Sequence, residues 1–250
     1  MSDWFSGPRP RVIAHRGLAL GAPENTLLAF VQAMAIGVTH LETDVHATSD
    51  GVAVISHDPD LGRLTGDSTP LASRTRDELR RVRLGADQTV STLADLLDAL
   101  PDAFFNIDLK VDAVVEPAVA AIDAARACDR VLITSFDDRR RQRALDALPG
   151  VATSPGSRGV VAAALAGRLR APMIARRVFD SVDALQIPEH HRGVRILTPE
   201  LVRLAHNRGV EVHVWTVNDP ADMRRLLDLG VDGLITDRAD LALDVVAARA

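Results

Sequence analysis

Short apolar runs alternate with amphipathic stretches along the chain, and no Gly/Ser-rich or Pro-rich linker interrupts the alternation. The amphipathic stretches place apolar residues at helical spacing, as Val115, Val119 and Ile122 do. Strands that alternate with helices of this length indicate βαβ units and a parallel sheet. The pattern predicts strands at residues 11–15, 40–45, 103–109, 130–134, 151–153, 184–187, 210–215 and 233–236. It predicts helices, among others, at residues 26–36, 93–100, 114–126, 139–148, 199–207 and 221–229.

Eight predicted strands favour an α/β fold of the TIM type, a (β/α)₈ barrel, over a six-stranded doubly wound sheet, which stays open as the alternative. No G-x-G-x-x-G follows the first strand, which weakens a dinucleotide-binding interpretation. A length of 250 residues suits one barrel, so we expect a single catalytic domain over residues 1–250. Residues 58–90 are turn-rich and end in a basic helical patch. We interpret them as a short insertion after the second strand, on the face where barrel enzymes form active sites.

The composition excludes several classes of protein. A formal net charge of −5 argues against a nucleic-acid partner. The single cysteine, Cys128, excludes an intrachain disulfide framework. The first residues show no secretory signal, and no window approaches the roughly 18 apolar residues of a membrane span. We therefore expect a cytoplasmic protein without stable membrane insertion, whose oligomeric state stays open.

The first candidate segment for chemistry follows the first predicted strand. His15 and Arg16 place a titratable group beside a fixed cation. The planar guanidinium suits phosphate because it donates two parallel hydrogen bonds. Residues 23–26, Pro-Glu-Asn-Thr, resemble a helix start. For Glu24 and Asn25, capping of that helix and contact with a substrate both stay open.

The second segment ends the second predicted strand. Glu42 and Asp44 are two residues apart on a strand and therefore share one face. Two like-charged carboxylates repel each other where water is excluded, and a divalent cation relieves that repulsion. Oxygen ligands alone favour Mg²⁺ or Ca²⁺. A solvated outer face is the alternative, but the apolar flanking residues oppose it. Asp50-Gly51 then signals a hairpin that would fold His57 back towards the carboxylates.

The third segment ends the third predicted strand, where Asn106, Asp108 and Lys110 share one face by the same period of two. Asp108 and Lys110 could form a structural ion pair, but beside the other segments we favour a third metal carboxylate and a phosphate-binding ammonium. The combined set of two histidines, three carboxylates, an arginine and a lysine suits phosphodiester cleavage. Cations neutralise charge in the transition state, and histidines transfer protons near neutral pH.

These motifs resemble the signature of the glycerophosphodiester phosphodiesterase family. The similarity is dense as far as Lys110, sparse from there to about Glu211, and clear again near the end of the chain. The motifs that carry it are His15-Arg16-Gly17, Pro23-Glu24-Asn25-Thr26, Glu42-Thr43-Asp44-Val45, Thr48-Ser49-Asp50-Gly51, His57-Asp58, Asn106-Ile107-Asp108-Leu109-Lys110, residues 214–218 and residues 230–237.

The resemblance implies a TIM-type barrel that hydrolyses glycerophosphodiesters to glycerol 3-phosphate and an alcohol with a divalent metal. It leaves open which histidine is the base, and whether water or a glycerol hydroxyl is the nucleophile. By position, it assigns general acid and base catalysis to His15 and His57, metal ligation to Glu42, Asp44 and Asp108, phosphate binding to Arg16 and Lys110, and an apolar wall to Trp215.

One position departs from the family pattern, which usually has Glu where this chain has Asp108. The shorter side chain reaches about one bond less far, while metal ligation tolerates only a few tenths of an ångström. A water-mediated ligand, weaker activity or a shifted metal preference would follow. Alternatives are a lysophospholipase D-like or inositol-phosphodiester lyase-like activity, or a phosphate-ligand binding protein with weakened catalysis. We also expect Ser135, Phe136 and Gln186 to line the pocket, with His213 as a further candidate.

Overall fold

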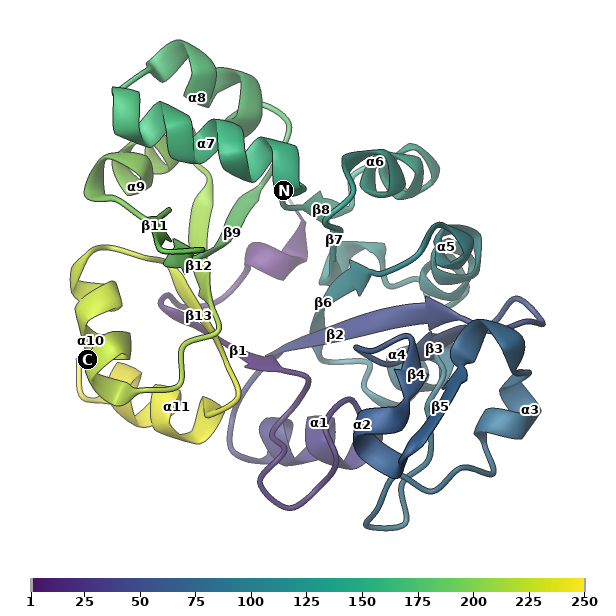
Figure 1. Ribbon diagram of the computed structural model, residues 1–250. Coiled ribbons are helices and arrows are strands. Elements are labelled where there is room, and N and C mark those ends of the chain that lie inside the picture. The colour runs from purple at the N-terminus through teal and green to yellow at the C-terminus, as the bar shows by residue number, and fades with distance from the viewer. Residues whose placement is uncertain (1, 250) are drawn as a thin grey trace.

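Eight parallel strands form the wall of a nearly closed barrel in this computed structural model, which describes residues 2–249 (Figure 1). They follow the order β8-β7-β6-β2-β1-β13-β12-β9, which confirms the TIM-type fold and excludes the doubly wound alternative. All eight predicted strands are present. Their bounds are β1 (Arg11–His15), β2 (His40–Ala47), β6 (Phe104–Leu109), β7 (Val131–Thr134), β8 (Ala152–Thr153), β9 (Ala184–Pro188), β12 (Glu211–Trp215) and β13 (Gly233–Thr236).

The seam between β8 and β9 is closed without a strand ladder. The Asp183 backbone N–H donates to the Thr153 carbonyl at 2.9 Å, and the Thr153 backbone N–H donates to Asp183 Oδ2 at 3.0 Å. The Gln186 backbone N–H donates to Ser154 Oγ at 3.1 Å. These bonds satisfy buried backbone groups that an open edge would leave unpaired, so they hold the two edge strands together.

Helices surround the barrel, and most begin at a side chain that caps the free N–H groups, as Thr26, Thr92 and Thr198 do. The six predicted helices are α1 (Leu27–Ala35), α4 (Leu93–Ala99), α5 (Val115–Ala124), α6 (Asp138–Ala147), α9 (Pro199–His206) and α10 (Pro220–Asp228). Three further helices lie outside the ranges named from the sequence: α7 (Ser157–Leu169), α8 (Pro172–Phe179) and α11 (Ala239–Ala247). Short 3₁₀ turns lie at Asp3–Phe5, Leu71–Ser73, Asp112–Val114 and Cys128–Arg130.

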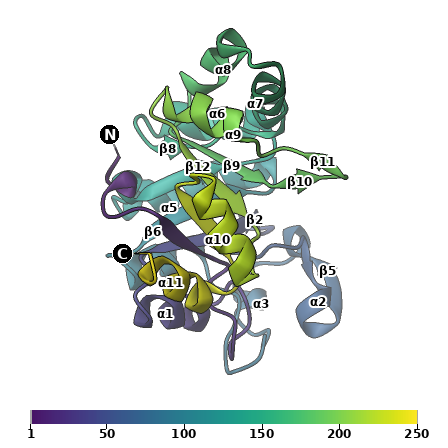
Figure 2. The ribbon, with the colours of Figure 1, turned by 90° about the vertical axis from the view of Figure 1, so that its left-hand side faces the viewer.

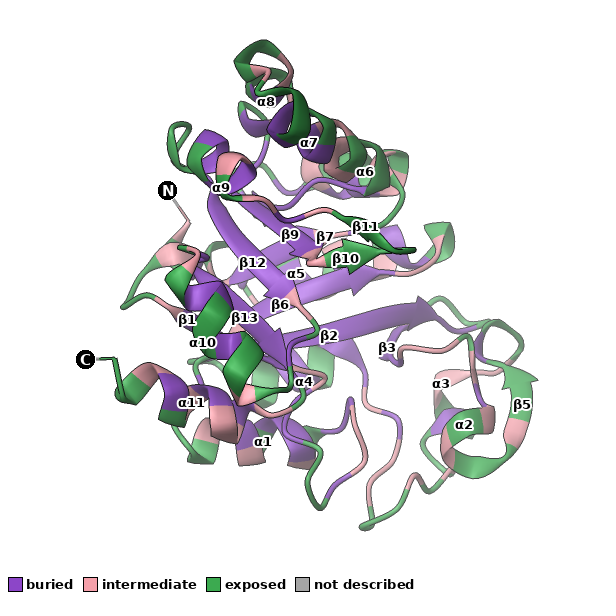
Figure 3. Cartoon of the chain, turned by 60° about the vertical axis from the view of Figure 1, so that its left-hand side comes forward, coloured by how far each residue is buried: buried purple, intermediate pink, exposed green. Residues whose placement is uncertain are grey.

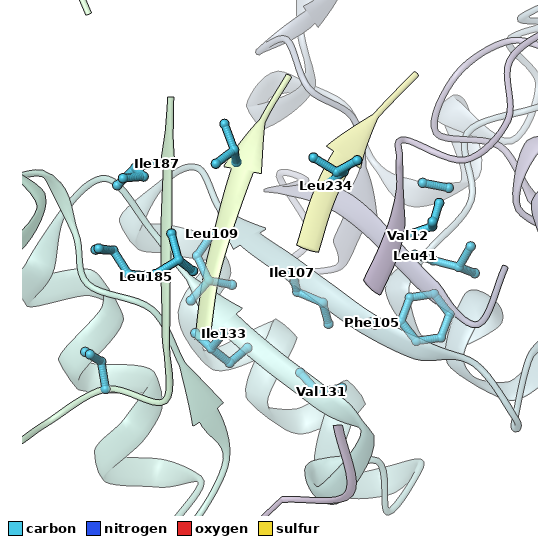
Figure 4. Packing of buried hydrophobic residues seen from close by; sticks show 14 of the residues in the cluster. Val12, Leu41, Phe105, Ile107, Leu109, Val131, Ile133, Leu185, Ile187 and Leu234 are labelled. Carbon is cyan, nitrogen blue, oxygen red and sulfur yellow. The ribbon is translucent and has the colours of Figure 1, made fainter. Parts of the chain in front are cut away.

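Strand alternation divides the barrel into an outer and an inner layer. Phe105, Ile107 and Leu109 of β6 point outwards into the main core beneath the helices (Figure 4). The strands of the barrel wall are mostly buried, and the helices around them carry both buried and exposed residues (Figure 3). Inside the barrel, Trp4 and Ile13 belong to a second apolar cluster. Alternate residues of each strand therefore reach the barrel interior, and those near the strand ends can form a site.

Residues 58–90 leave the barrel after the hairpin of β2 and β3 (Ala53–Ile55), whose turn holds Gly51 at φ +75°. Leu61, Leu71, Leu79 and Val90 of this part form a small core with Val54 of β3. It contains β4 (Asp60–Leu61), α2 (Gly62–Thr65), β5 (Asp67–Pro70) and α3 (Arg76–Leu79). A second hairpin, β10 (His190–His191) with β11 (Val194–Arg195), projects on the same side of the barrel (Figure 2). Within residues 2–249, no helix combines the length and the apolar character needed to cross a membrane.

Candidate active site

A cavity of about 340 Å³ opens at the C-terminal ends of the barrel strands. One wall is polar, and the opposite wall is largely apolar. Ser135, Phe136 and Gln186 line the cavity as expected. His213 does not, because its side chain is fully buried in the barrel interior and hydrogen-bonds to Glu211. The lining includes all eight predicted site residues: His15, Arg16, Glu42, Asp44, His57, Asp108, Lys110 and Trp215.

Strand register brings the three polar segments together. In the parallel ladders, His15 is the partner of Glu42 and Asp44 is the partner of Asp108. Glu42 likewise stands beside Asn106. Neighbouring residues in register point the same way, so segments distant in the sequence converge in two adjacent rows, one of His15, Glu42 and Asn106 and one of Asp44 and Asp108.

His15 is held by a carboxylate on its far side. Its Nδ1 donates to Asp237 Oδ1 at 2.6 Å, and Asn218 Nδ2 donates to Asp237 Oδ2 at 2.7 Å. The ionised carboxylate can only accept, so Nδ1 carries the proton and Nε2 faces the site. Burial alone would lower the His15 pKa, but the charge of Glu42 and the Asp237 hydrogen bond outweigh it and raise that pKa. Asp237 therefore fixes the tautomer of this imidazole and, together with Glu42, raises its basicity.

His57 repeats this arrangement in the same cavity. Its Nδ1 donates to Asp58 Oδ1 at 2.8 Å, while Arg63 Nε donates to Asp58 Oδ2 at 2.7 Å. Burial opposes ionisation of Asp58, but the bonds from His57 and Arg63 prevail and lower its pKa. The hairpin at Gly51 has therefore brought His57 back to the carboxylates as predicted, with its ring oriented.

The three carboxylates of the polar wall are buried and charged unequally. Glu42 has a pKa raised to about 8, first because it is buried and second because Asp44 repels its charge. Asp44 is buried too, but the Lys110 ammonium prevails and lowers its pKa. Burial raises the pKa of Asp108 despite the same ammonium. Lys110 Nζ lies 2.7 Å from Asp44 Oδ1 and 2.6 Å from Asp108 Oδ2, so this ammonium bridges two of the three carboxylates.

The chemistry of this wall fits a divalent cation, although its geometry does not form a complete ligand set. Within residues 2–249, no group of three or more His, Cys, Asp or Glu side chains is arranged to hold a metal ion. The Lys110 ammonium bridges Asp44 and Asp108 instead. Asp108 Oδ1 is nevertheless buried and has no hydrogen-bond partner among the described residues. An unpartnered carboxylate oxygen beside Glu42 and Asp44 suits a hard cation. The ligand roles of these three residues stay a prediction.

In residues 23–26, Thr26 caps the helix, Glu24 and Asn25 do not, and contact of those two side chains with a substrate stays a prediction. Thr26 caps α1 by accepting from the Ala29 backbone N–H. Asn25, at φ +55°, donates from Nδ2 to Asp44 Oδ2 at 3.1 Å and so orients that carboxylate. Glu24 accepts from Arg16 Nη1 at 2.9 Å and also accepts from Arg63. This segment therefore orients Asp44 and Arg16, and Arg16 is held between Glu24 and Asp44.

The apolar wall is formed by side chains from separate elements. Phe136 and Trp215 meet edge to face with their ring centroids 6.1 Å apart. Val160, Val161 and Ile196 extend the same wall. Lys110 Nζ lies 5.8 Å from the Phe136 ring centroid, so the aromatic pair borders the charged end of the site.

Sequence reasoning missed Asp237 and Asn218 as site residues. Both lie in the closing segments that resemble the family, but neither was predicted to have a role. The signal that could have found Asp237 is strand register. Ala14 pairs with Thr236, so the next residue, Asp237, stands beside His15.

Comparison with known proteins gives one consistent result. The sequence profile described as "Glycerophosphoryl diester phosphodiesterase family" matches residues 15–241. A Mycobacterium tuberculosis protein named "Probable glycerophosphodiester phosphodiesterase 2" is 45% identical over 95% of this chain and 90% of its own length.

Solved structures agree with the sequence relatives. A glycerophosphodiester phosphodiesterase from Thermotoga maritima is 27% identical, with a TM-score of 0.73 over 94% of this chain and 97% of that one. An Oleispira antarctica phosphodiesterase, solved with the product sn-glycerol-3-phosphate, shares the fold at a TM-score of 0.78 and 23% identity, over 96% of this chain and 97% of that one. Because the profile and the 45% identical relative both span most of its length, this chain belongs to the glycerophosphoryl diester phosphodiesterase family.

Proposed function

We propose that this chain hydrolyses glycerophosphodiesters to glycerol 3-phosphate and an alcohol, using His15 and His57 as the proton-transfer pair. The observation that carries the proposal is that two imidazoles, each oriented by a carboxylate at Nδ1, share one cavity with three acids and two cations. The solved relative that binds sn-glycerol-3-phosphate supports this substrate class.

The roles of the residues follow from their contacts. His15 and His57 present Nε2 to the cavity, so one can accept a proton from the nucleophile while the other protonates the leaving alcohol. Arg16 and Lys110 hold the phosphate and counter its charge. Trp215 and Phe136 cover the apolar side of the glycerol or the leaving group and exclude water there.

A divalent cation, Mg²⁺ or Ca²⁺, would be held by Glu42, Asp44 and Asp108, because their donor atoms are all oxygens. When bound, it would polarise the phosphoryl oxygens and stabilise negative charge. Lys110 must then release at least one of its two carboxylates, which frees its ammonium for phosphate. The short Asp108 side chain is the member of this set most sensitive to ion size.

The test is turnover of glycerophosphocholine and related glycerophosphodiesters with Mg²⁺ or Ca²⁺ added separately. We expect glycerol 3-phosphate to form, chelator to abolish the reaction, and His15→Ala to lower it by about 100-fold or more, as loss of a general acid or base does. His190→Ala is the matched control, because His190 is an exposed histidine of the β10–β11 hairpin. Full turnover with chelator would contradict the metal requirement, and full turnover of His15→Ala would contradict proton transfer by His15.

The apolar wall favours a second candidate, a lysophospholipase D-like reaction at the same centre. Phe136, Val160 and Val161 form an apolar surface that a glycerophosphodiester with a small head group does not need. Replacing glycerophosphocholine by lysophosphatidylcholine in the same assay separates the candidates. A higher kcat/KM for the lysolipid would select the second.

A further inference from the structure

Helix α7 carries its large apolar side chains on the outside. Val161, Leu165 and Leu169 are spaced four residues apart and therefore lie along one side of the helix. Their exposed fractions are 67%, 47% and 63%. We call these three residues the outer stripe. Met173, at the start of α8, is 73% exposed and adds to the apolar surface of this helical hairpin.

The inner face of α7 is built from small residues. Ala163, Ala166 and Gly167 are buried. A Cβ at Gly167 would lie 2.8 Å from Leu201 Cβ, so α7 packs closely on α9. A helix that only covers a core turns its large aliphatic residues inwards. Here the order is reversed, so the outer stripe contributes nothing to the barrel core and needs another explanation.

The same hairpin is strongly basic. Residues 157–179 contain five arginines and no Asp or Glu, in a chain whose net charge is −5. Arg176 pairs with Asp180 at 3.2 Å, whereas Arg158, Arg168, Arg170 and Arg177 form no salt bridge within residues 2–249. Two copies of this surface would repel each other, so charge favours an anionic partner over a second copy of the chain.

The outer stripe begins at the mouth of the active-site cavity. Val161 belongs both to the stripe and to the cavity lining, next to Val160 and Phe136. Phe136 is itself 60% exposed. Figure 2 shows α7 towards the same side of the barrel as the β10–β11 hairpin and the α2–β5 segment. A partner that covers the stripe would therefore lie against the entrance to the site.

We propose that the α7–α8 hairpin docks this protein on the surface of an anionic lipid bilayer. The outer stripe and Met173 enter the boundary between head groups and acyl chains, and the unpaired arginines contact lipid phosphates. Apolar residues beside arginines, without acidic residues between them, are the pattern of such interfacial helices. The docked barrel then holds its cavity mouth at the membrane, where lipid-derived phosphodiesters are released.

The experiment is vesicle sedimentation of the full chain with phosphatidylcholine vesicles and with vesicles that also contain phosphatidylglycerol. We expect binding to the anionic vesicles only. Arg168→Gln/Arg177→Gln should weaken partitioning about 25-fold, since each arginine near an anionic surface contributes about fivefold. Leu165→Gln/Leu169→Gln should weaken it at least as much.

A charge-matched control is Arg126→Gln/Arg224→Gln, which removes two arginines outside the hairpin and should bind as the unaltered chain does. Turnover of glycerophosphocholine in solution should be unchanged in all three variants, which reports that they fold. Equal binding of the hairpin variants and the control, or no binding of the unaltered chain to anionic vesicles, overturns the proposal. So does a dimer in sedimentation velocity that Leu165→Gln/Leu169→Gln dissolves, because a second copy would then cover the stripe.

Discussion

The bond between His15 and Asp237 offers the sharpest test of the site, because Asp237→Asn removes one charge and keeps the shape. In the variant, the new amide oxygen can still accept from Asn218, which turns the amide nitrogen towards His15 Nδ1. That nitrogen donates, so the imidazole must place its proton on Nε2 instead of Nδ1. The ring then faces the substrate with the wrong tautomer for accepting a proton.

The magnitude follows from the geometry of the pair. The distance of 2.6 Å between His15 Nδ1 and Asp237 Oδ1 marks a short, charge-assisted bond. A hydrogen bond to a charged group contributes about 1.5–3 kcal/mol of net stabilisation. The Asp237 side chain is 49% exposed, and solvent weakens the interaction, so about 1.5–2 kcal/mol is appropriate. That corresponds to a loss of about 10- to 30-fold in kcat/KM.

The assay is the pH profile of kcat/KM for glycerophosphocholine. Asp237 helps to raise the His15 pKa, so Asp237→Asn should shift the limb that reports His15 to lower pH. If His15 is the base, the acid limb moves; if it is the acid, the alkaline limb moves. Asp240→Asn is the control, because Asp240 pairs with Arg238 instead. If kcat/KM of Asp237→Asn stays within about twofold of the unaltered chain and both limbs of its pH profile stay in place, Asp237 does not position His15.

Two further predictions concern stability. His40 is buried, and burial is the chief reason that its pKa is lowered to about 4. As the pH falls from about 6.5 to 4, the unfolded chain gains a proton at this position and the folded chain does not. The free energy of unfolding should therefore drop by about 3 kcal/mol over that window. In urea denaturation, His40→Gln should lack this part of the pH dependence of the free energy of unfolding. The same pH dependence in the variant and the unaltered chain would contradict the prediction. Gly167→Ala should destabilise by about 1–3 kcal/mol, through its clash with Leu201, although Ala favours helices. Gly21→Ala, in open space, is the control, and a raised melting temperature for Gly167→Ala would contradict the close packing of α7.

The strands and the polar wall could be predicted because their signals are local. A period of two separates Asn106, Asp108 and Lys110 from the apolar residues between them, and the structure has these two sets on opposite faces of β6. The hairpin that returns His57 depends on one turn dipeptide, which the sequence displays. The whole barrel follows from counting such runs, since each strand is short, apolar and separated from the next by a helix.

Helix α7 gives a weak signal in the sequence for a physical reason. Sequence patterns identify a helix by large apolar residues on its buried side. Helix α7 buries Ala163, Ala166 and Gly167, while Leu165 and Leu169 face outwards. The spacing of its large apolar residues therefore marks the exposed side of the helix and not the buried side. Because its large apolar residues are exposed, such a helix is hard to predict from the sequence, and the same exposed residues suggest a partner.

The position of Asp237 follows from the closure of the barrel and not from a local pattern in the sequence. Closure of the barrel places β13 beside β1, although His15 and Asp237 are 222 residues apart. With Ala14 paired to Thr236, the next residue on each strand must meet at the rim. Chemistry requires a group that fixes the tautomer of a catalytic imidazole, and the first and last strands of a closed barrel always adjoin. The acid after the last strand of such a chain is therefore the natural partner for a histidine that ends the first, and the Asp237→Asn pH profile tests that rule directly.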